Sequence, residues 1–301
     1  MAVPLLTVFT PTFNRSHTLP RTYKSLLHQT CKDFIWLIVD DGSSDGTKEL
    51  VGSWIQEDEI SIKYIYQDNQ GMHGAHNTAY RNIDTELNVC IDSDDYMPND
   101  AIEKILTCWR ERGSDAYAGV IGLDYSVNGN LIGTAFPEGM METTLSGFYE
   151  RGGKGDKKLV YRTDIIKSYP EYPIFEDEKY FGLAYKYHLI DQEYKLLVLN
   201  EPLVIVDYQP DGSSLGMFRQ YWNNPNGFMF FRKSEMRLQK SVSSRFRSCI
   251  HYVSHCIRAG KKNEFYLNSH PVLTFFAIPF GFMLYLYTKH KVKKGVVMRI
   301  S

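Results

Sequence analysis

The chain has 301 residues, 43% of them hydrophobic, and a formal net charge of −1, which suits one large domain or two coupled ones. The near-neutral charge argues against a nucleic-acid-binding protein, which usually carries a basic excess. Five cysteines without a CxxC pair are typical of reduced thiols and argue against a disulfide framework or a zinc site. The N-terminal segment lacks a basic stretch followed by an apolar one, so we expect no signal peptide and a cytoplasmic location.

The first hundred residues alternate between strand-like and helix-like patterns. In the last of the helix-like segments, Ile102, Ile105, Leu106 and Trp109 recur at the spacing of one helical face. The alternation predicts βαβ units, and hence a Rossmann-like, mostly parallel central sheet flanked by helices. The expected strands are 5–9, 34–39, 62–66 and 87–91, and the expected helices are 19–30, 47–56, 74–83 and 98–112.

The middle of the chain is less regular, with strand-like segments at 116–123, 158–162, 195–199 and 203–206. A Gly-rich turn, RGGKGDKK at 151–158, is either a mobile flap that brings Lys157 or Lys158 to a phosphate or a plain surface loop. From residue 214 the pattern is helical, basic and aromatic. We therefore expect three parts, at 1–100, 101–213 and 214–301.

Residues 271–287, PVLTFFAIPFGFMLYLY, are almost wholly apolar and are followed by the basic segment TKHKVKKGVVMR. A membrane-spanning helix needs about 20 apolar residues, and this run is shorter and contains Pro279 and Gly281. The basic flank suits an anionic cytoplasmic leaflet, so we favour attachment to the membrane surface. A buried C-terminal helical hairpin and a true membrane span are the alternatives.

Polar segments follow each of the first four expected strands. Ligands of open α/β sheets bind outside the carboxyl ends of the strands, so we expect these segments to converge on one edge. They are TPTFNR at 10–15, DDGS at 40–43, QDNQG at 67–71 and DSDD at 92–95.

The segment DDGSSDG at 40–46 does not fit the common ligand-binding loops. A calcium loop needs Glu at its twelfth position, which is Gly52 when counted from Asp41, and no P-loop or GxGxxG fingerprint is present. Ser44 or Asp45 can cap the helix that follows, but such a cap leaves Asp40 unexplained. A carboxylate at this strand end suits hydrogen bonding to a base or a ribose hydroxyl.

Asp92 and Asp94 can both reach one hard cation if the turn that carries them bends. Magnesium and manganese prefer carboxylate and phosphate oxygens, and such an ion would neutralise a diphosphate leaving group. The alternative is an acidic cluster that only caps the next helix.

Together, TVFTPTFNR, LLHQTCKDFIWLIVDDGSSDGT and CIDSDD resemble the inverting nucleotide-sugar glycosyltransferases of family 2, which have the GT-A fold. The resemblance covers residues 4–110 well and 150–215 more loosely. It implies that Asp92 and Asp94 form the metal-binding DxD pair, with Asp94 on Mn²⁺ or Mg²⁺. It also implies that Pro11 and Thr12 line the base pocket and that Asp40 holds uracil or ribose. The full set of expected donor-binding residues is Pro11, Thr12, Asn14, Asp40, Asp68, Asn69, His76, Asp92 and Ser93.

One position departs from the family pattern. Family members often carry ARN on the helix after the third strand, where the arginine reaches a phosphate. Here the match is Ala75-His76-Asn77, so His76 occupies the phosphate position although a histidine is only partly charged at neutral pH.

An inverting transfer needs a general base within hydrogen-bond reach of the acceptor hydroxyl. The resemblance implies a Glu-Asp pair near the start of a helix in the second half, and FEDEKYF at 175–181 offers one. Asp177 is the base if Glu176-Asp177 is the pair, and a slip of one residue would make it Glu178. A solvated acidic helix start is the alternative. The resemblance also places a substrate-closing loop at DYQPDGSS, 207–214.

The sequence thus predicts a GT-A enzyme with a C-terminal helical extension, acting at the cytoplasmic face of the membrane. It would move a sugar from a UDP-sugar to a saccharide or lipid-linked acceptor in bacterial surface polysaccharide synthesis. We expect a divalent metal and no nucleic-acid partner, and a homo-oligomeric state is left open. Two alternative functions are a non-catalytic nucleotide-sugar-binding scaffold and a nucleotidyltransferase. The scaffold would have no need of Asp92, Asp94 and Asp177 together. The nucleotidyltransferase would usually show a Gly-rich, basic turn after the first strand.

Overall fold

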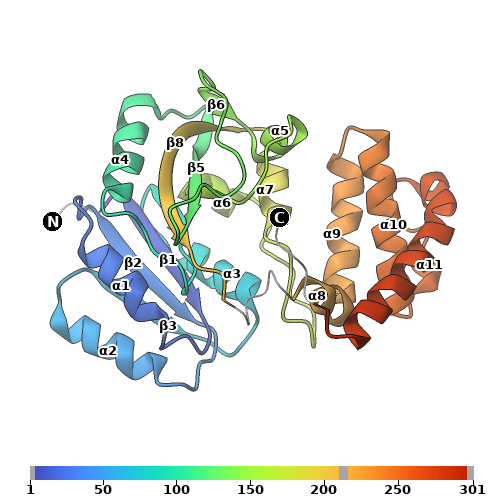
Figure 1. Ribbon diagram of the computed structural model, residues 1–301, viewed down its shortest axis with the longest axis horizontal. Coiled ribbons are helices and arrows are strands. Elements are labelled where there is room, and N and C mark those ends of the chain that lie inside the picture. The colour runs from blue at the N-terminus through green and yellow to red at the C-terminus, as the bar shows by residue number, and fades with distance from the viewer. Residues whose placement is uncertain (1–3, 210–215, 297–301) are drawn as a thin grey trace. The chain divides into compact units, whose positions relative to one another are not determined.

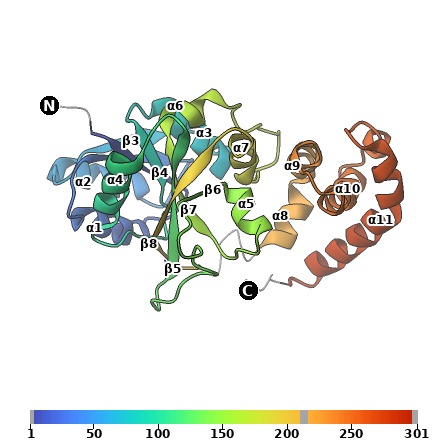
Figure 2. The ribbon, with the colours of Figure 1, turned by 90° about the horizontal axis from the view of Figure 1, so that it is seen from above.

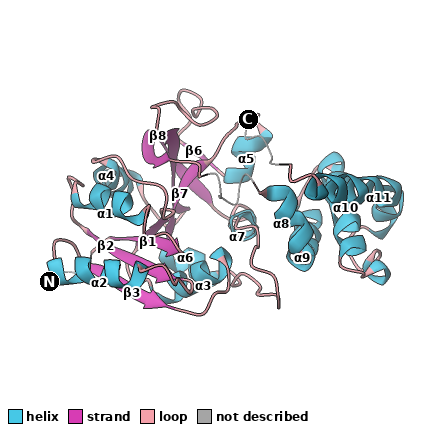
Figure 3. Cartoon of the chain, turned by 60° about the horizontal axis from the view of Figure 1, so that its bottom comes forward, coloured by secondary structure: helices cyan, strands magenta, loops and turns pink. Residues whose placement is uncertain are grey.

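The computed structural model describes residues 4–209 and 216–296. The chain forms two compact units, Met1–Glu171 with Ile190–Tyr208, and Tyr172–Leu189 with Gln209–Ser301. Figure 3 shows the strands in the first unit, while the second is helical. The expected boundary near residue 100 does not separate compact units, because most of 101–213 packs with 1–100. The boundary expected near 213 lies outside the described residues. The roles expected for the three parts stay predictions: nucleotide-sugar binding for 1–100, acceptor binding for 101–213 and membrane association for 214–301.

The first unit is built on an eight-stranded sheet in the order β3-β2-β1-β4-β7-β5-β8-β6 (Figure 1). Four of the seven strand pairings are parallel: β1 with β2, β1 with β4, β2 with β3, and β5 with β8. The strands are β1 Leu6–Thr12, β2 Phe34–Asp40, β3 Ile62–Tyr66, β4 Leu87–Cys90, β5 Tyr117–Ser126, β6 Glu142–Thr143, β7 Lys157–Arg162 and β8 Lys195–Val206. The helices of this unit are α1 Leu19–Leu27, α2 Thr47–Glu57, α3 Met72–Asn82, α4 Ala101–Arg112, α5 Leu145–Glu150 and α6 Thr163–Ser168.

Strand β1 is buried along its whole length because helices cover both of its faces. Leu6 and Val8 belong to a core cluster that also contains side chains of α1, α2 and α4. Phe9 points the other way, and its ring lies 5.1 Å from the ring of His76 and 5.4 Å from that of Tyr80, both on α3. Two covered faces explain why such a strand is continuously apolar instead of alternating.

The eight elements expected between residues 5 and 112 are all present, with ends shifted by a few residues. One expectation in the second hundred is wrong: 195–199 and 203–206 form a single strand, β8. Pro202 does not end it, because the proline pairs with Leu123 where the register to β5 shifts. A proline is tolerated at such an irregularity, where the ladder already lacks a regular hydrogen bond.

The second unit is made of α7 Ala184–Ile190, whose last residue belongs to the first unit, and α8 Met217–Asn223, α9 Pro225–Leu238, α10 Val242–Arg258, η1 Lys262–Glu264 and α11 Pro271–Lys293. Figures 1 and 2 show α10 between α9 and α11. Their shared core contains Met236, Cys249, Tyr252 and Ala277. Among the described residues, α11 is the one helix long and apolar enough to cross a membrane. The five cysteines are free, as expected.

Candidate active site

The polar segments expected at one edge of the sheet do meet there. In the parallel register Thr12 of β1 is opposite Asp40 of β2, and Asp40 is opposite Tyr66 of β3. β4 runs in the same direction, with its last residue, Cys90, opposite Phe9. The ends of these four strands and the loops that follow them therefore carry the predicted donor-binding residues other than His76, which lies in α3.

Asp40 is fully buried, and both of its carboxylate oxygens have partners within the protein. Oδ1 accepts the backbone N–H of Ser43 at 2.8 Å, and Oδ2 accepts the hydroxyl of Tyr64 at 2.6 Å. Burial and the adjacent Asp40 raise the pKa of Tyr64, which keeps this hydroxyl a donor. Asp40 thus stabilises the turn after β2. The binding of a base or ribose predicted for Asp40 would be a second role in addition to this structural one.

Asp41, which the sequence did not single out, fixes the neighbouring loop. Its carboxylate accepts the side-chain amide of Gln67 at 2.6 Å and the backbone N–H groups of Gln70 at 2.9 Å and Gly71 at 2.8 Å. The side-chain amide of Asn69 donates to the Asp41 carbonyl oxygen at 2.9 Å. The loop between β3 and α3, which contains the expected donor ligands, is therefore held against the end of β2.

Asn14 connects the loops after β1 and β2. Its backbone is left-handed (φ 52°), its N–H donates to the Ser43 hydroxyl at 2.9 Å, and its side-chain oxygen accepts the N–H of Ser44 at 2.8 Å. The N-cap of α2 is Gly46 and not Ser44 or Asp45, although Asp45 accepts the Thr47 hydroxyl at 2.6 Å.

The remaining base-pocket candidates differ in exposure: Pro11 and Thr12 are buried and Asp68 is exposed. A cavity of ≈ 300 Å³ opens beside the end of β3, lined by Ser43, Thr47 and Tyr66 among others. This cavity lies at the carboxyl edge, next to the predicted donor-binding residues.

His76 is fully buried in α3. Its Nδ1 lies 2.9 Å from the carbonyl oxygen of Met72, and its ring packs edge-on against Phe9 and Tyr80. These contacts place His76 in the packing between α3 and β1, and its phosphate-binding role stays a prediction.

Three acids lie close together after β4. Asp92 and Asp94 are partly buried, whereas Ser93 and Asp95 are buried. Burial and the charge of Asp92 raise the pKa of Asp94, and the same two causes raise the pKa of Asp95 to about 8. The turn therefore concentrates negative charge in a poorly solvated place.

Two basic side chains, Arg21 and Lys158, stabilise this turn. Arg21 of α1 donates to the Asp94 carbonyl oxygen and pairs with Asp207 at 2.7 Å. Lys158 of β7 donates to the Cys90 carbonyl oxygen at 3.2 Å. Burial lowers the pKa of Lys158, but the carboxylates of Asp124, Asp92 and Asp95 outweigh that effect and raise it.

Lys157, the other candidate from the Gly-rich turn, has a structural position. Its Nζ donates to the backbone carbonyl oxygens of Lys154 at 2.9 Å, Asp156 at 3.0 Å and Ile132 at 3.2 Å. Through these charge-assisted hydrogen bonds the ammonium group of Lys157 stabilises the backbone of the Gly-rich turn.

The acids after β4 fit a divalent cation in their chemistry. Crowded, desolvated carboxylates with raised pKa values are stabilised by a positive ion, and carboxylate oxygens are what Mg²⁺ and Mn²⁺ prefer. Within 4–209 and 216–296, no group of three or more His, Cys, Asp or Glu side chains could hold a metal ion by itself. A cation here would therefore take its remaining oxygen ligands from water or from a bound ligand.

The segment 175–181 in the second unit is not a helix start. Glu176 and Asp177 form an exposed turn in which Asp177 has a left-handed backbone (φ 62°). Glu178 is 5% exposed, and its carboxylate accepts the N–H of Gly227 at 2.7 Å and the N–H and side-chain amide of Asn226 at 2.8 and 2.7 Å. Asn224, missed by the sequence argument, accepts the N–H groups of Lys179 at 2.9 Å and Tyr180 at 3.0 Å.

These contacts separate the two candidate bases. Glu178 is engaged at the N-terminus of α9, where the helix dipole also favours its negative charge. Asp177 is exposed beside it. Of the pair left open by the sequence, Asp177 is therefore the one whose carboxylate is presented to solvent.

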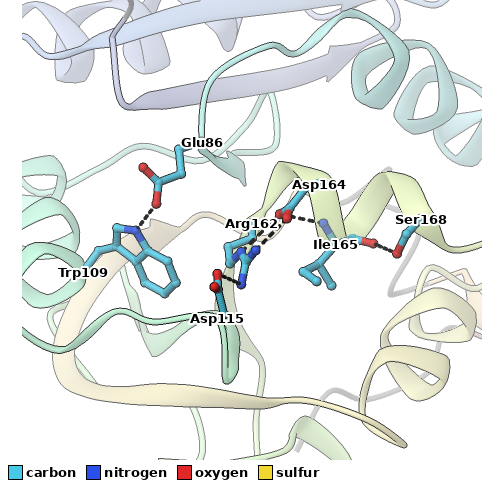
Figure 4. A network of polar contacts seen from close by, with 7 residues as sticks. All are labelled: Glu86, Trp109, Asp115, Arg162, Asp164, Ile165 and Ser168. Atoms are coloured by element: carbon cyan, nitrogen blue, oxygen red, sulfur yellow. Dashed lines mark hydrogen bonds and ion pairs between the residues drawn. The ribbon is translucent and has the colours of Figure 1, made fainter.

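A second cavity, of ≈ 600 Å³, opens near the start of β4, the end opposite to Asp92. Figure 4 shows polar contacts among residues of its lining. Arg162 binds Asp164 at 2.6 Å and Asp115 at 3.2 Å, and Trp109 donates to Glu86 at 2.6 Å. Because these contacts join β7, α4 and the segment before β4, we assign the cluster a role in stabilising the fold.

The family model "Glycosyl transferase family 2" matches residues 7–167, more than half of the chain. The chain belongs to glycosyl transferase family 2. The match contains every predicted donor-binding and metal-binding residue of this family 2 chain and ends before Asp177.

The family 2 chain is similar to curated and solved proteins. A "GalNAc(5)-diNAcBac-PP-undecaprenol beta-1,3-glucosyltransferase" of Campylobacter jejuni is 34% identical over 122 residues, which cover 40% of this chain and only 38% of that relative. S. aureus TarS 1-349 in complex with UDP-GlcNAc aligns over 98% of this chain and 93% of its own, with a TM-score of 0.59 and 16% identity. The mannosyltransferase PcManGT of Pyrobaculum calidifontis, in complex with GDP-Man and Mn²⁺, aligns over 95% and 82%, with a TM-score of 0.54 and 14% identity. The two structures establish the GT-A fold.

Proposed function

We propose that this family 2 chain is an inverting glycosyltransferase that moves a sugar from a UDP-sugar to a saccharide acceptor. The observation that carries the proposal is the acidic turn after β4. Burial and mutual repulsion there raise the pKa values of Asp94 and Asp95, at the sheet edge where we expect the donor to bind. A structural acidic cap would not need to keep several carboxylates in a poorly solvated place.

Donor binding is assigned to the carboxyl edge of the sheet. Thr12 and Pro11 would line the base, and Asp40, Asp68 and Asn69 would contact the base or ribose. His76 is assigned to the diphosphate, although its ring also packs edge-on against Phe9 and Tyr80.

Asp92 and Asp94 would hold the divalent cation, with Ser93 lining the same turn. When bound, the cation supplies positive charge that stabilises the departing diphosphate. Lys158 and Arg21 hold the turn through the carbonyl oxygens of Cys90 and Asp94, so the acids keep their place while their charges repel.

Asp177 would accept the proton of the acceptor hydroxyl in the same displacement that inverts the anomeric carbon. The attacking oxygen forms the new glycosidic bond as the bond to the diphosphate breaks. Asp177 is exposed in a left-handed turn, and Glu178 and Asn224 fasten the residues that follow it to α9.

The acceptor is proposed to be lipid-linked, in bacterial surface polysaccharide synthesis at the cytoplasmic face of the membrane. Two things support this assignment. The Campylobacter jejuni relative has a saccharide on PP-undecaprenol in its name, and the second unit of this chain carries the exposed apolar helix α11.

The deciding experiment is a thermal-shift panel of UDP-sugars and GDP-sugars, each with and without Mn²⁺. A ligand that binds only the folded state raises the midpoint of unfolding. We expect a UDP-sugar to raise it, and to raise it more with Mn²⁺, and Asp94→Asn to remove the metal-dependent part. A shift produced only by GDP-sugars would overturn the donor, and no shift with any nucleotide-sugar would overturn the proposal.

A further inference from the structure

Helix α11 has two faces of opposite character. The buried face consists of Thr274, Ala277, Gly281 and Thr288. Gly281 allows close contact with α10, since a Cβ at this position would lie 2.6 Å from the Cβ of Val253 and 2.9 Å from the Ile250 carbonyl oxygen. One side of α11 is therefore fixed against α10.

The other face of α11 is an exposed apolar surface, which we call the apolar stripe. At 100° per residue, its members fall within an arc of about 120° on the helix. They are 47 to 71% exposed: Val272, Phe275, Phe276, Phe282, Met283 and Leu286. A continuous exposed patch of this kind on a soluble protein marks a binding surface.

The charge around the stripe identifies its partner. Residues 216–296 contain fourteen Lys and Arg against two Asp and Glu, a net charge of +12 in a chain whose total is −1. Four of the lysines lie at the C-terminal end of α11, after the stripe, and we call them the basic end. They are Lys289, Lys291 and Lys293 in the helix and Lys294 at its C-cap. Lys291 lies over the ring of Tyr287, 5.3 Å from its centroid. An apolar face bordered by lysines and aromatic rings matches the boundary between acyl chains and anionic headgroups.

We propose that the C-terminal unit docks on bilayers that contain anionic phospholipid, with the apolar stripe in the interface and the basic end on the headgroups. A second copy of the chain is the weaker occupant, because two copies of the segment 216–296, each with a net charge of +12, would repel each other. The stripe also offers no polar side chain that would fix the register of a protein partner.

The helix lies in the plane of the interface and does not cross it. Its 23 residues would reach across a hydrocarbon core. However, its buried face is packed on α10, which carries Arg245, Arg247 and Arg258 and cannot follow it into hydrocarbon. A crossing would strip α11 from α10 and expose Cys249 and Tyr252 of the shared core.

The inference deepens the proposed function, since it names the surface through which a lipid-linked acceptor would be met, but it can fail separately. The test is flotation of the full chain with vesicles of phosphatidylcholine alone or with about a third phosphatidylglycerol. We expect binding to the anionic vesicles that weakens in high salt. Phe276→Glu with Met283→Glu should weaken it by at least about 100-fold. Lys291→Gln with Lys293→Gln should weaken it about 25-fold on anionic vesicles and leave phosphatidylcholine binding unchanged.

The matched control is Ile55→Glu, which changes an exposed apolar residue on α2 in the first unit and should float like the wild type. Far-UV circular dichroism must show the variants folded, and their UDP-sugar thermal shifts should equal that of the wild type. No binding to either vesicle, or equal binding to both that ignores the lysine changes, overturns the inference. So does a dimer in analytical ultracentrifugation that Phe276→Glu with Met283→Glu dissolves. If a UDP-sugar still raises the midpoint of unfolding in these cases, the membrane inference fails and the proposed function stands.

Discussion

Replacing Glu178 by alanine tests how the turn with Asp177 is held. The Glu178 carboxylate accepts three hydrogen bonds of 2.7–2.8 Å from Asn226 and Gly227, two of them from backbone N–H groups in the first turn of α9. These N–H groups have no partner within the helix, so Glu178 acts as its cap from outside. Hydrogen bonds to a charged group are worth about 1.5–3 kcal/mol each, and a lost cap costs about 1 kcal/mol.

The three bonds share one carboxylate, and water can replace part of what is lost, so their energies do not add. We expect Glu178→Ala to lower the free energy of unfolding by about 2–4 kcal/mol, measured by urea denaturation and followed by circular dichroism. Glu178→Gln keeps one acceptor oxygen and should cost about 1–2 kcal/mol. Glu176→Ala removes an exposed acid from the same turn and should stay within about 0.5 kcal/mol of the wild type.

The same variants test function. Because Glu178 acts through the turn, Glu178→Ala should lower kcat for transfer at temperatures where it is folded, leave the UDP-sugar thermal shift unchanged, and be partly rescued in Glu178→Gln. The reasoning is refuted if Glu178→Ala unfolds at the same urea concentration as the wild type, or if Glu176→Ala costs as much.

Three further predictions concern single carboxylates. Asp177→Asn should lower sugar transfer by at least about 100-fold, as expected for a lost general base, with the UDP thermal shift intact; transfer near the wild-type rate would exclude this base. Asp94→Asn should abolish the Mn²⁺-dependent part of UDP binding by calorimetry, and unchanged Mn²⁺ dependence would exclude the metal role. Burial raises the pKa of Asp124 from 3.8 to about 6. The folded chain therefore keeps a proton that the unfolded chain has lost, and this stability, present below pH 4, disappears as the pH rises through 6. Asp124→Asn should gain about 2 kcal/mol over the wild type on going from pH 4.5 to 7.5 in urea denaturation, and equal differences at both values would contradict the shift.

The first hundred residues were predictable because local patterns decide their structure. The apolar runs of β1 and β2, the helical spacing in α4 and the polar residues after each strand all follow from burial on two faces of a parallel sheet. The convergence of the four polar segments followed from topology alone. β8 was not predictable in this way, because whether Pro202 ends a strand depends on the partner across the register shift with β5.

The roles of the acids were harder to predict than their positions. Asp40 and Asp41 both follow β2, and either could bind a ligand by composition. In the structure Asp40 accepts from Ser43 and Tyr64, and Asp41 accepts from the loop before α3. A carboxylate that accepts backbone N–H groups and one that binds a substrate have the same chemistry. Only their hydrogen-bond partners within the folded protein distinguish them. The same comparison sets Glu178 apart from Asp177.

The total charge shows how an average over the chain can hide a binding surface. A value of −1 correctly argues against a chain that is basic throughout, but it is the difference between a basic helical part and an acidic remainder. Because charges are screened beyond about 8–10 Å at physiological salt, a partner at α11 responds to the nearby lysines of the basic end and not to the total charge. The sum over residues 216–296 needs no structure. What the structure adds is that the side chains of the apolar stripe are exposed on the face of α11 opposite to its buried residues, so the local charge borders an exposed apolar face.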